Sequence, residues 1–243
     1  RSLNSIILSL NHAKILFPRI DFDIVVIDYN SKRNDLDKIN EQLSKSNLKN
    51  SIISLDINEF KNNINKINAK NEEVTLNQMS NMSNINKSLL IAKEQCKDLV
   101  YFVEDDYLHK LEAMKEMIFA YERISSQINR ELILCPTDYP YLYTKIDPTN
   151  IFLGSTKHWR TVGETLCTFL TSKSMLEKHW EKFISMCKFE HYPFEKPLHE
   201  IYKSEYCLSP IPSLAFHFTN INSIFGLSPN ADWEKIWNDN ENY

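Results

Sequence analysis

The hydrophobic positions in the first half of the chain follow two kinds of pattern. Apolar residues recur at helical spacing over 2–17, 35–46 and 83–97, and short apolar runs occupy 23–28, 51–55 and 99–103. Spacings of three and four residues predict helices that bury one face, and short apolar runs predict buried strands. Because strands and helices alternate from residue 23 onward, we expect an α/β fold with a mostly parallel central sheet flanked by helices.

The second half is less regular and predicts a smaller, mixed part. The expected helices are 111–124, 172–187 and 193–203, and the expected strands are 131–135, 151–156 and 166–171. We expect the last two strands to pair with each other and to flank the segment HWRTVGE. Trp233 and Trp237 lie four residues apart and indicate a short terminal helix. The Asn-rich and Lys-rich segment 58–71 predicts a mobile loop.

Composition narrows the class of protein. The chain has 243 residues and a net charge of -4, so it lacks the basic surplus of a nucleic-acid-binding protein. No apolar run approaches the ~20 residues of a membrane span. The five cysteines are dispersed, which favours reduced thiols and a cytoplasmic location, with peripheral attachment to a membrane left open. With only three glycines, the chain cannot form the glycine-rich loops of dinucleotide-binding or P-loop proteins.

An acidic run follows the apolar strand at 99–103. Glu104, Asp105 and Asp106 would be costly to bury together, so we expect them at the carboxyl end of that strand, where α/β sheets bind ligands. Closely spaced carboxylates suit Mg²⁺ or Mn²⁺, especially with a phosphate as a further ligand. The alternative is a strand that ends in a solvated acidic turn.

Two segments carry a family resemblance. DIVVIDYNS at 23–31 and YFVEDDY at 101–107 resemble the corresponding segments of GT-A fold glycosyltransferases, in particular the family-2-like nucleotide-sugar transferases. The resemblance covers residues 1–135 and is loose beyond them. It implies that Asp28 contacts the nucleoside. Tyr29 replaces the second acid of the usual pair, and its ring could stack on a base or pack in the core or at the rim.

The resemblance also implies an activity and a division of the chain. We expect a metal-dependent, inverting transfer of a sugar from a nucleotide-diphosphate sugar to a carbohydrate or other hydroxyl acceptor. Residues 1–135 would bind the donor and 136–243 the acceptor, within one compact domain. The family's first strand would lie upstream of Arg1, or the sheet is built differently. The alternatives are a nucleotidyltransferase and a catalytically inactive GT-A-like domain.

The metal and phosphate ligands follow from the acidic run and from two later residues. In GT-A glycosyltransferases a DxD motif binds the cation. Glu104 and Asp106 match it as Glu-x-Asp, or Asp105 and Asp106 match it in a shifted register. Asp106 is the expected direct ligand, and Glu104 or Asp105 would act through water or on the ribose. Some GT-A enzymes have a C-terminal histidine that contacts the metal or phosphate, a role open to His217. A packed, hydrogen-bonded His217 is the alternative.

The general base is left open by the sequence. In HWRTVGE, Arg160 could pair with a phosphate and Glu164 could accept the proton of the acceptor hydroxyl. A surface hairpin in which these residues pair is the alternative. Glu195 and Glu200 lie near an expected helix start, where many members of the family place their base. Asp138 and Glu190 are further competing carboxylates.

Overall fold

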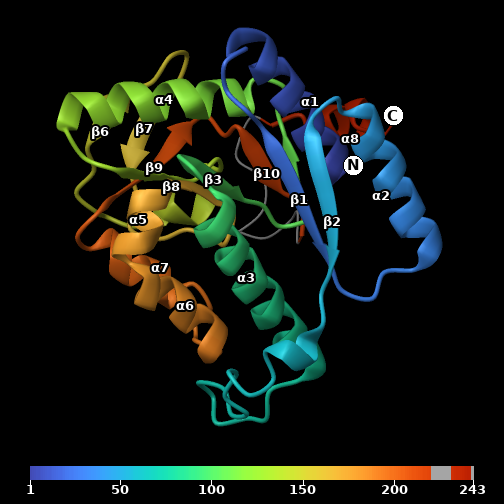
Figure 1. Ribbon diagram of the computed structural model, residues 1–243. Coiled ribbons are helices and arrows are strands. Elements are labelled where there is room, and N and C mark those ends of the chain that lie inside the picture. Colours follow the sequence, from blue (N-terminus) through green and yellow to red (C-terminus); the bar gives the residue numbers. More distant parts are fainter. Residues whose placement is uncertain (220–230, 242–243) are drawn as a thin grey trace.

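The computed structural model describes residues 1–219 and 231–241 and shows a layered α/β fold (Figure 1). Its largest sheet has six strands in the order β3-β8-β5-β9-β7-β6. Their bounds are β3 (Leu99–Phe102), β5 (Leu132–Leu134), β6 (Ile151–Leu153), β7 (His158–Thr161), β8 (Phe169–Ser172) and β9 (Tyr206–Ile211). Within this sheet β5 and β9 pair in parallel, and the other pairs are antiparallel. The expectation of a mostly parallel central sheet is therefore not confirmed.

Two strand pairs lie outside the large sheet. β1 (Asp23–Asp28) and β2 (Lys49–Ser54) form a parallel pair, and β4 (Tyr107–His109) and β10 (Ala215–His217) form an antiparallel pair. The alternation of strands and helices predicted the parallel direction correctly for β1 and β2. It did not predict the antiparallel direction of β8, because an apolar run indicates burial and carries no information about strand direction.

The helices cover both faces of the large sheet. Their bounds are α1 (Ser2–Leu16), α2 (Arg33–Lys45), α3 (Leu76–Gln95), α4 (Ala113–Ile128), α5 (Lys173–Lys178), α6 (Trp180–Lys188), α7 (Lys196–Tyr202) and α8 (Trp233–Asp239), with 3₁₀ turns η1 (Ile57–Glu59) and η2 (Pro140–Thr144). Helices α1 and α4 pack in one hydrophobic cluster, and α3, α5, α6 and α7 pack in another. No described helix combines the length and the apolar composition needed to cross a membrane.

Alternating side chains of the strands supply the two clusters. Ile133 of β5 packs with α3 and α6, whereas Leu132 and Leu134 pack with α1 and α4. Phe169 and Leu170 of β8 divide in the same way. This alternation follows from the two-residue period of a strand. Each face of the sheet therefore contributes side chains to one of the two clusters.

One predicted strand pairing and two predicted helices differ from the structure. The segment HWRT is itself strand β7 and pairs with β6, whereas β8 pairs with β3 and β5, so the predicted pairing of 151–156 with 166–171 is wrong. The predicted helix 172–187 is divided at His179 into α5 and α6. Helix α3 begins earlier than predicted, because Thr75 and Gln78 form a capping box there.

Candidate functional site

The pairing of β4 with β10 builds the centre of the site. Tyr107 lies opposite His217 in this antiparallel pair, and Phe218 N–H donates to the carbonyl of Asp106 at 2.8 Å. This register brings the His217 imidazole beside the last acid of the run, with Nε2 2.9 Å from Asp106 Oδ2. Two residues that the sequence suggested as metal ligands are therefore neighbours, although 111 positions separate them in the chain.

The Asp106 carboxylate is held in its ionised form. Burial alone would raise its pKa, but hydrogen bonds from His217 and Thr219 to Oδ2 outweigh that effect and lower the pKa. Its second oxygen, Oδ1, is buried and has no hydrogen-bond partner among the described residues. A buried carboxylate oxygen without a partner is costly, and a bound cation would satisfy it.

Glu104 and Glu195 add two more carboxylates to this region. Burial, together with the negative charges of Asp106 and Glu195, raises the pKa of Glu104 to about 7. The pKa of Glu195, at the N-cap of α7, is also raised by burial. Burial is the main cause of both shifts, and like charges add to the shift of Glu104. Near neutral pH Glu104 can hold a proton while Asp106 stays charged.

Aromatic residues pack beneath the acids. The Tyr107 ring stacks on His217 with centroids 5.0 Å apart, and its hydroxyl lies 2.5 Å from the hydroxyl of Tyr139. Both tyrosines are fully buried. The buried pair fixes the plane of the His217 ring, and therefore the direction in which its nitrogens point.

A cavity of about 460 Å³ opens next to the acids. Asp105 and Asp106 line one side of it, and the start of α1 and the two tryptophans of α8 line the other. Figure 1 shows α8 beside the beginning of α1, with both marked chain ends on this side of the molecule. The volume lies within the usual range for small-molecule sites.

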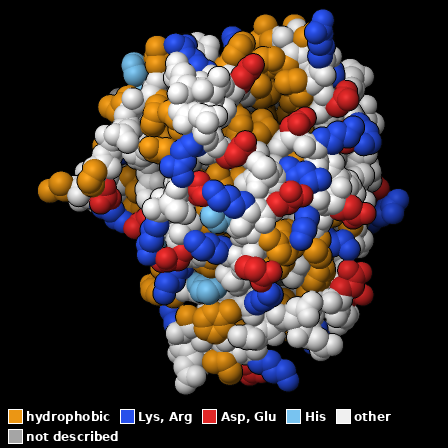
Figure 2. Space-filling model, turned by 60° about the vertical axis from the view of Figure 1, so that its left-hand side comes forward, with side chains coloured by type: hydrophobic (Ala, Val, Ile, Leu, Met, Phe, Trp, Pro, Cys, Tyr) orange, Lys and Arg blue, Asp and Glu red, His pale blue; other side chains and the backbone are white. Residues whose placement is uncertain are grey.

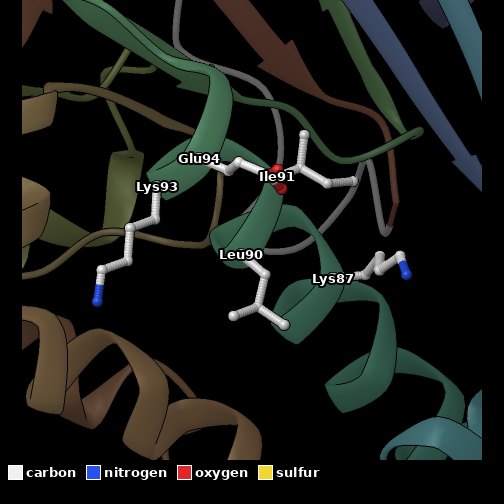
Figure 3. A pocket seen from close by; sticks show the side chains of 5 residues that line it. All are labelled: Lys87, Leu90, Ile91, Lys93 and Glu94. Atoms are coloured by element: carbon white, nitrogen blue, oxygen red, sulfur yellow. The ribbon is translucent and has the colours of Figure 1, made fainter.

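The exposed side of α3 offers a second hollow that is a weaker candidate. In Figure 3, its lining side chains Lys87, Leu90 and Lys93 point away from one another. Lys87 pairs with Glu59 at 3.1 Å, and Lys93 lies 4.0 Å over the Trp180 ring. Figure 2 shows a face where acidic and basic side chains are interspersed. The polar groups of the α3 hollow do not converge on a common point.

Arg160 and Glu164, both in the segment HWRTVGE, form ion pairs with other residues of the chain. Arg160 donates to Asp138 at 2.8 Å within the fold, and its guanidinium lies 4.3 Å over the Tyr143 ring. A phosphate would have to displace Asp138 to bind it. Glu164 forms a surface ion pair with Lys145 at 2.5 Å. The alternative for this segment, a surface pair between Arg160 and Glu164, is not formed, because each residue pairs with another partner.

The remaining candidates for a base differ in their surroundings. Glu190 accepts from Gln78 at 2.6 Å, and Glu200 forms an exposed ion pair with Lys203 at 2.7 Å. Of the carboxylates proposed as bases, Glu195 is the one whose charge acts on Glu104. This electrostatic contact links it to the acidic run.

Asp28 and Tyr29 lie at the carboxyl end of β1. Asp28 accepts from the Ser31 N–H at 3.2 Å, and Tyr29 packs in a small cluster with Leu55 and Met82. Within the described part of the chain, neither forms a hydrogen bond or ion pair with Asp105 or Asp106. Their role toward a nucleoside stays a prediction.

The side chains at this site could bind a cation only together with ligands from water or a substrate. Among the described residues, no three His, Cys, Asp or Glu side chains are grouped closely enough to hold a metal ion by themselves. Mg²⁺ commonly takes one or two carboxylates and completes its shell with water and substrate phosphates. Asp106, with its partnerless Oδ1, and His217 fit that incomplete type of site.

Two contacts at the site were not predicted from the sequence. Thr168 accepts from the backbone N–H of Glu104 at 3.0 Å, and the Thr219 hydroxyl donates to Asp106. Threonine next to an apolar run has no distinguishing local pattern, and these pairs are separated by 64 and 113 positions.

Comparison with known proteins leaves the family open. No protein-family model matches the chain, and a search of the curated proteins finds no relative. The geometry around Asp106 is therefore the basis for assigning a function.

Proposed function

We propose that this protein is a metal-dependent glycosyltransferase that uses a nucleotide-diphosphate sugar as its donor. The observation that carries the proposal is the pairing of Asp106 with His217 at the edge of a cavity, with Asp106 Oδ1 buried and unsatisfied in the described part of the chain. A carboxylate and an imidazole that share one coordination region suit Mn²⁺ or Mg²⁺ bridged to a diphosphate.

The proposed reaction forms one bond and breaks another, and each residue of the site has a role in it. The acceptor oxygen forms a bond to the anomeric carbon, and the bond from that carbon to the diphosphate breaks. A divalent cation, when bound, would supply charge stabilisation to the departing diphosphate. Asp106 and His217 would hold that cation, and Asp105 lies next to Asp106 in the chain. Glu195, whose pKa is raised by burial, accepts the proton of the acceptor hydroxyl.

The first test measures Mn²⁺-dependent hydrolysis or transfer with a panel of UDP-, GDP-, CDP- and dTDP-sugars. We expect Asp106→Asn to lower the rate roughly a hundredfold or more, because the cation loses its anionic ligand. Asp98→Asn is the matched control, since Asp98 is an exposed acid that precedes the opposite end of β3. It should retain the parent rate.

Calorimetric titration of nucleoside diphosphates with Mn²⁺ separates the alternatives. Loss of binding in Asp106→Asn and not in Asp98→Asn supports the proposal. Equal activity of Asp106→Asn and the parent would remove this site from the mechanism. Absence of binding to every donor in the parent protein would instead favour a catalytically inactive domain.

A further inference from the structure

We propose that the cavity beside Asp105 and Asp106 binds a pyranose ring, with the indole of Trp233 as its stacking surface. This inference rests on the proposed function and assigns the sugar-binding part of the same site. The ring would belong either to the donor sugar or to the acceptor sugar, and the two sources present the same chemistry to the cavity.

Two tryptophans of helix α8 line the cavity, and they differ in their contacts with other residues. Trp233 and Trp237 are four residues apart, so their side chains lie on the same side of the helix, and each is 37% exposed. Trp237 has two ring contacts: the Arg1 guanidinium lies 4.2 Å from its ring centroid, and the Phe218 ring stacks on it with centroids 5.5 Å apart. Trp233 has no ring or cation contact within the described residues. Its indole is the available aromatic surface.

The polar lining of the cavity includes the carboxylates of Asp105 and Asp106, beside Arg1, Ser2 and Thr219. Asp105 is exposed and forms no hydrogen bond or ion pair with any described residue. Sugar hydroxyls can donate to the Asp105 carboxylate, while the C–H face of a pyranose packs on an indole.

Two other ligand classes fit less well. A nucleobase can donate to a carboxylate from its ring or amino N–H groups, but it presents fewer donors than the hydroxyl rim of a pyranose. An organic cation would suit tryptophan and carboxylates, but Arg1 already places a guanidinium in this cavity, where it lies on Trp237 and pairs with Glu241 at 2.5 Å. The alternation of an apolar face and a donor-rich rim is characteristic of a sugar ring.

Saturation-transfer NMR on the full chain tests this inference with three methyl glycosides and with UDP-glucose plus Mn²⁺. The glycosides are the methyl β-pyranosides of glucose, galactose and N-acetylglucosamine. In the parent protein, irradiation of the aromatic protons should transfer saturation to pyranose ring protons. Trp233→Ala should weaken pyranose binding roughly tenfold, which corresponds to about 1.4 kcal/mol. Trp233→Phe should restore most of it.

Trp180→Phe is the matched control, because Trp180 lies on α6 against Lys93 and does not line this cavity. The indole N–H resonance of Trp237 reports whether α8 keeps its position in each variant. An unchanged Trp237 signal with lost pyranose binding supports the inference.

The arms of the experiment have distinct outcomes. Binding of free glycosides identifies an acceptor sugar, and pyranose signals that require UDP-glucose and Mn²⁺ identify the donor sugar. The inference is overturned if Trp233→Ala weakens UDP binding as much as it weakens UDP-glucose binding, because the cavity would then hold the nucleoside. It is also overturned if no pyranose proton receives saturation in either arm. Glycoside binding without Mn²⁺-dependent nucleotide binding would reject the proposed function and retain this site.

Discussion

His109 shows how burial alone determines the charge of a residue near the site. It is 3% exposed, its Nε2 lies 2.7 Å from the Tyr101 hydroxyl, and its Nδ1 lies 3.3 Å from the Ser5 hydroxyl. No carboxylate pairs with it among the described residues, and desolvation lowers the pKa of its imidazole to about 3. His109 therefore stays neutral in the folded protein and links β3 and β4 to α1.

The neutral His109 predicts a loss of stability in mild acid. Below pH ~6.5 the imidazole of the unfolded chain binds a proton that the folded chain does not bind, so the free energy of unfolding should fall as the pH decreases toward 3. The slope should reach about 1.4 kcal/mol per pH unit, and this contribution vanishes above pH ~6.5. Urea denaturation at a series of pH values measures it.

The variant His109→Asn should lose this part of the pH dependence. His158→Asn is the control, since His158 is exposed on β7 and should leave the slope unchanged. Parallel pH profiles for the parent and His109→Asn would show that the imidazole is not the cause.

At the scale of elements, a single carboxylate joins α4 to the β6–β7 hairpin. Glu116 is 1% exposed and accepts from the N–H groups of Ser155 and Thr156 at 2.9 and 2.8 Å, and from the Trp159 indole N–H at 3.3 Å. A Cβ at Gly154 would lie 2.5 Å from Glu116 Oε1, so the backbone there can approach only as glycine. The helix and the hairpin meet at this carboxylate.

Replacing Glu116 should therefore loosen the hairpin. Glu116→Gln puts an amide N–H₂ against N–H donors, and we expect the free energy of unfolding to fall by about 2–4 kcal/mol. Glu122→Gln, on the exposed side of the same helix, should change it by less than ~0.5 kcal/mol. Urea denaturation of both variants tests the difference, and equal stabilities would contradict this assignment.

At the scale of the molecule, both halves of the chain share both hydrophobic clusters. Leu89 and Ile133 pack with Phe183 on one face of the sheet, and Met117 and Leu134 lie in the cluster on the other face with residues from the second half. A third, smaller cluster consists of first-half residues, with Phe194 of the second half packed against it. Because both clusters on the large sheet are shared between the halves, we expect the chain to unfold in one cooperative transition.

A substitution at the centre of the sheet tests this expectation. Ile133→Ala removes buried methyl groups from a fully buried position and should lower the free energy of unfolding by about 2–5 kcal/mol. The calorimetric transition should move to lower temperature as a single peak. Two separate peaks, or a shift in only one of them, would show that residues 1–135 and 136–243 unfold independently.

The sequence predicted local features of this fold better than their assembly. Strand 23–28 was predicted at its observed bounds, and the acidic run after Val103 was predicted at the end of a strand. Both features depend on residue type and on the spacing of residues within one segment, so they can be recognised from that segment alone. The antiparallel direction of β8, the interruption at His179 and the engagement of Arg160 by Asp138 depend on neighbours far along the chain.

The order of residues along the chain sets which of them are apolar enough to form strands and helix faces, and it places three acids after one of those strands. Folding is what brings Asp106 to His217, Glu195 near Glu104, and the tryptophans of α8 to the cavity beside them. The two kinds of information differ in the distance along the chain over which they act. Burial preference and backbone periodicity act over a few residues, whereas the charge and hydrogen bonding of a site arise from groups that folding brings together across more than a hundred positions.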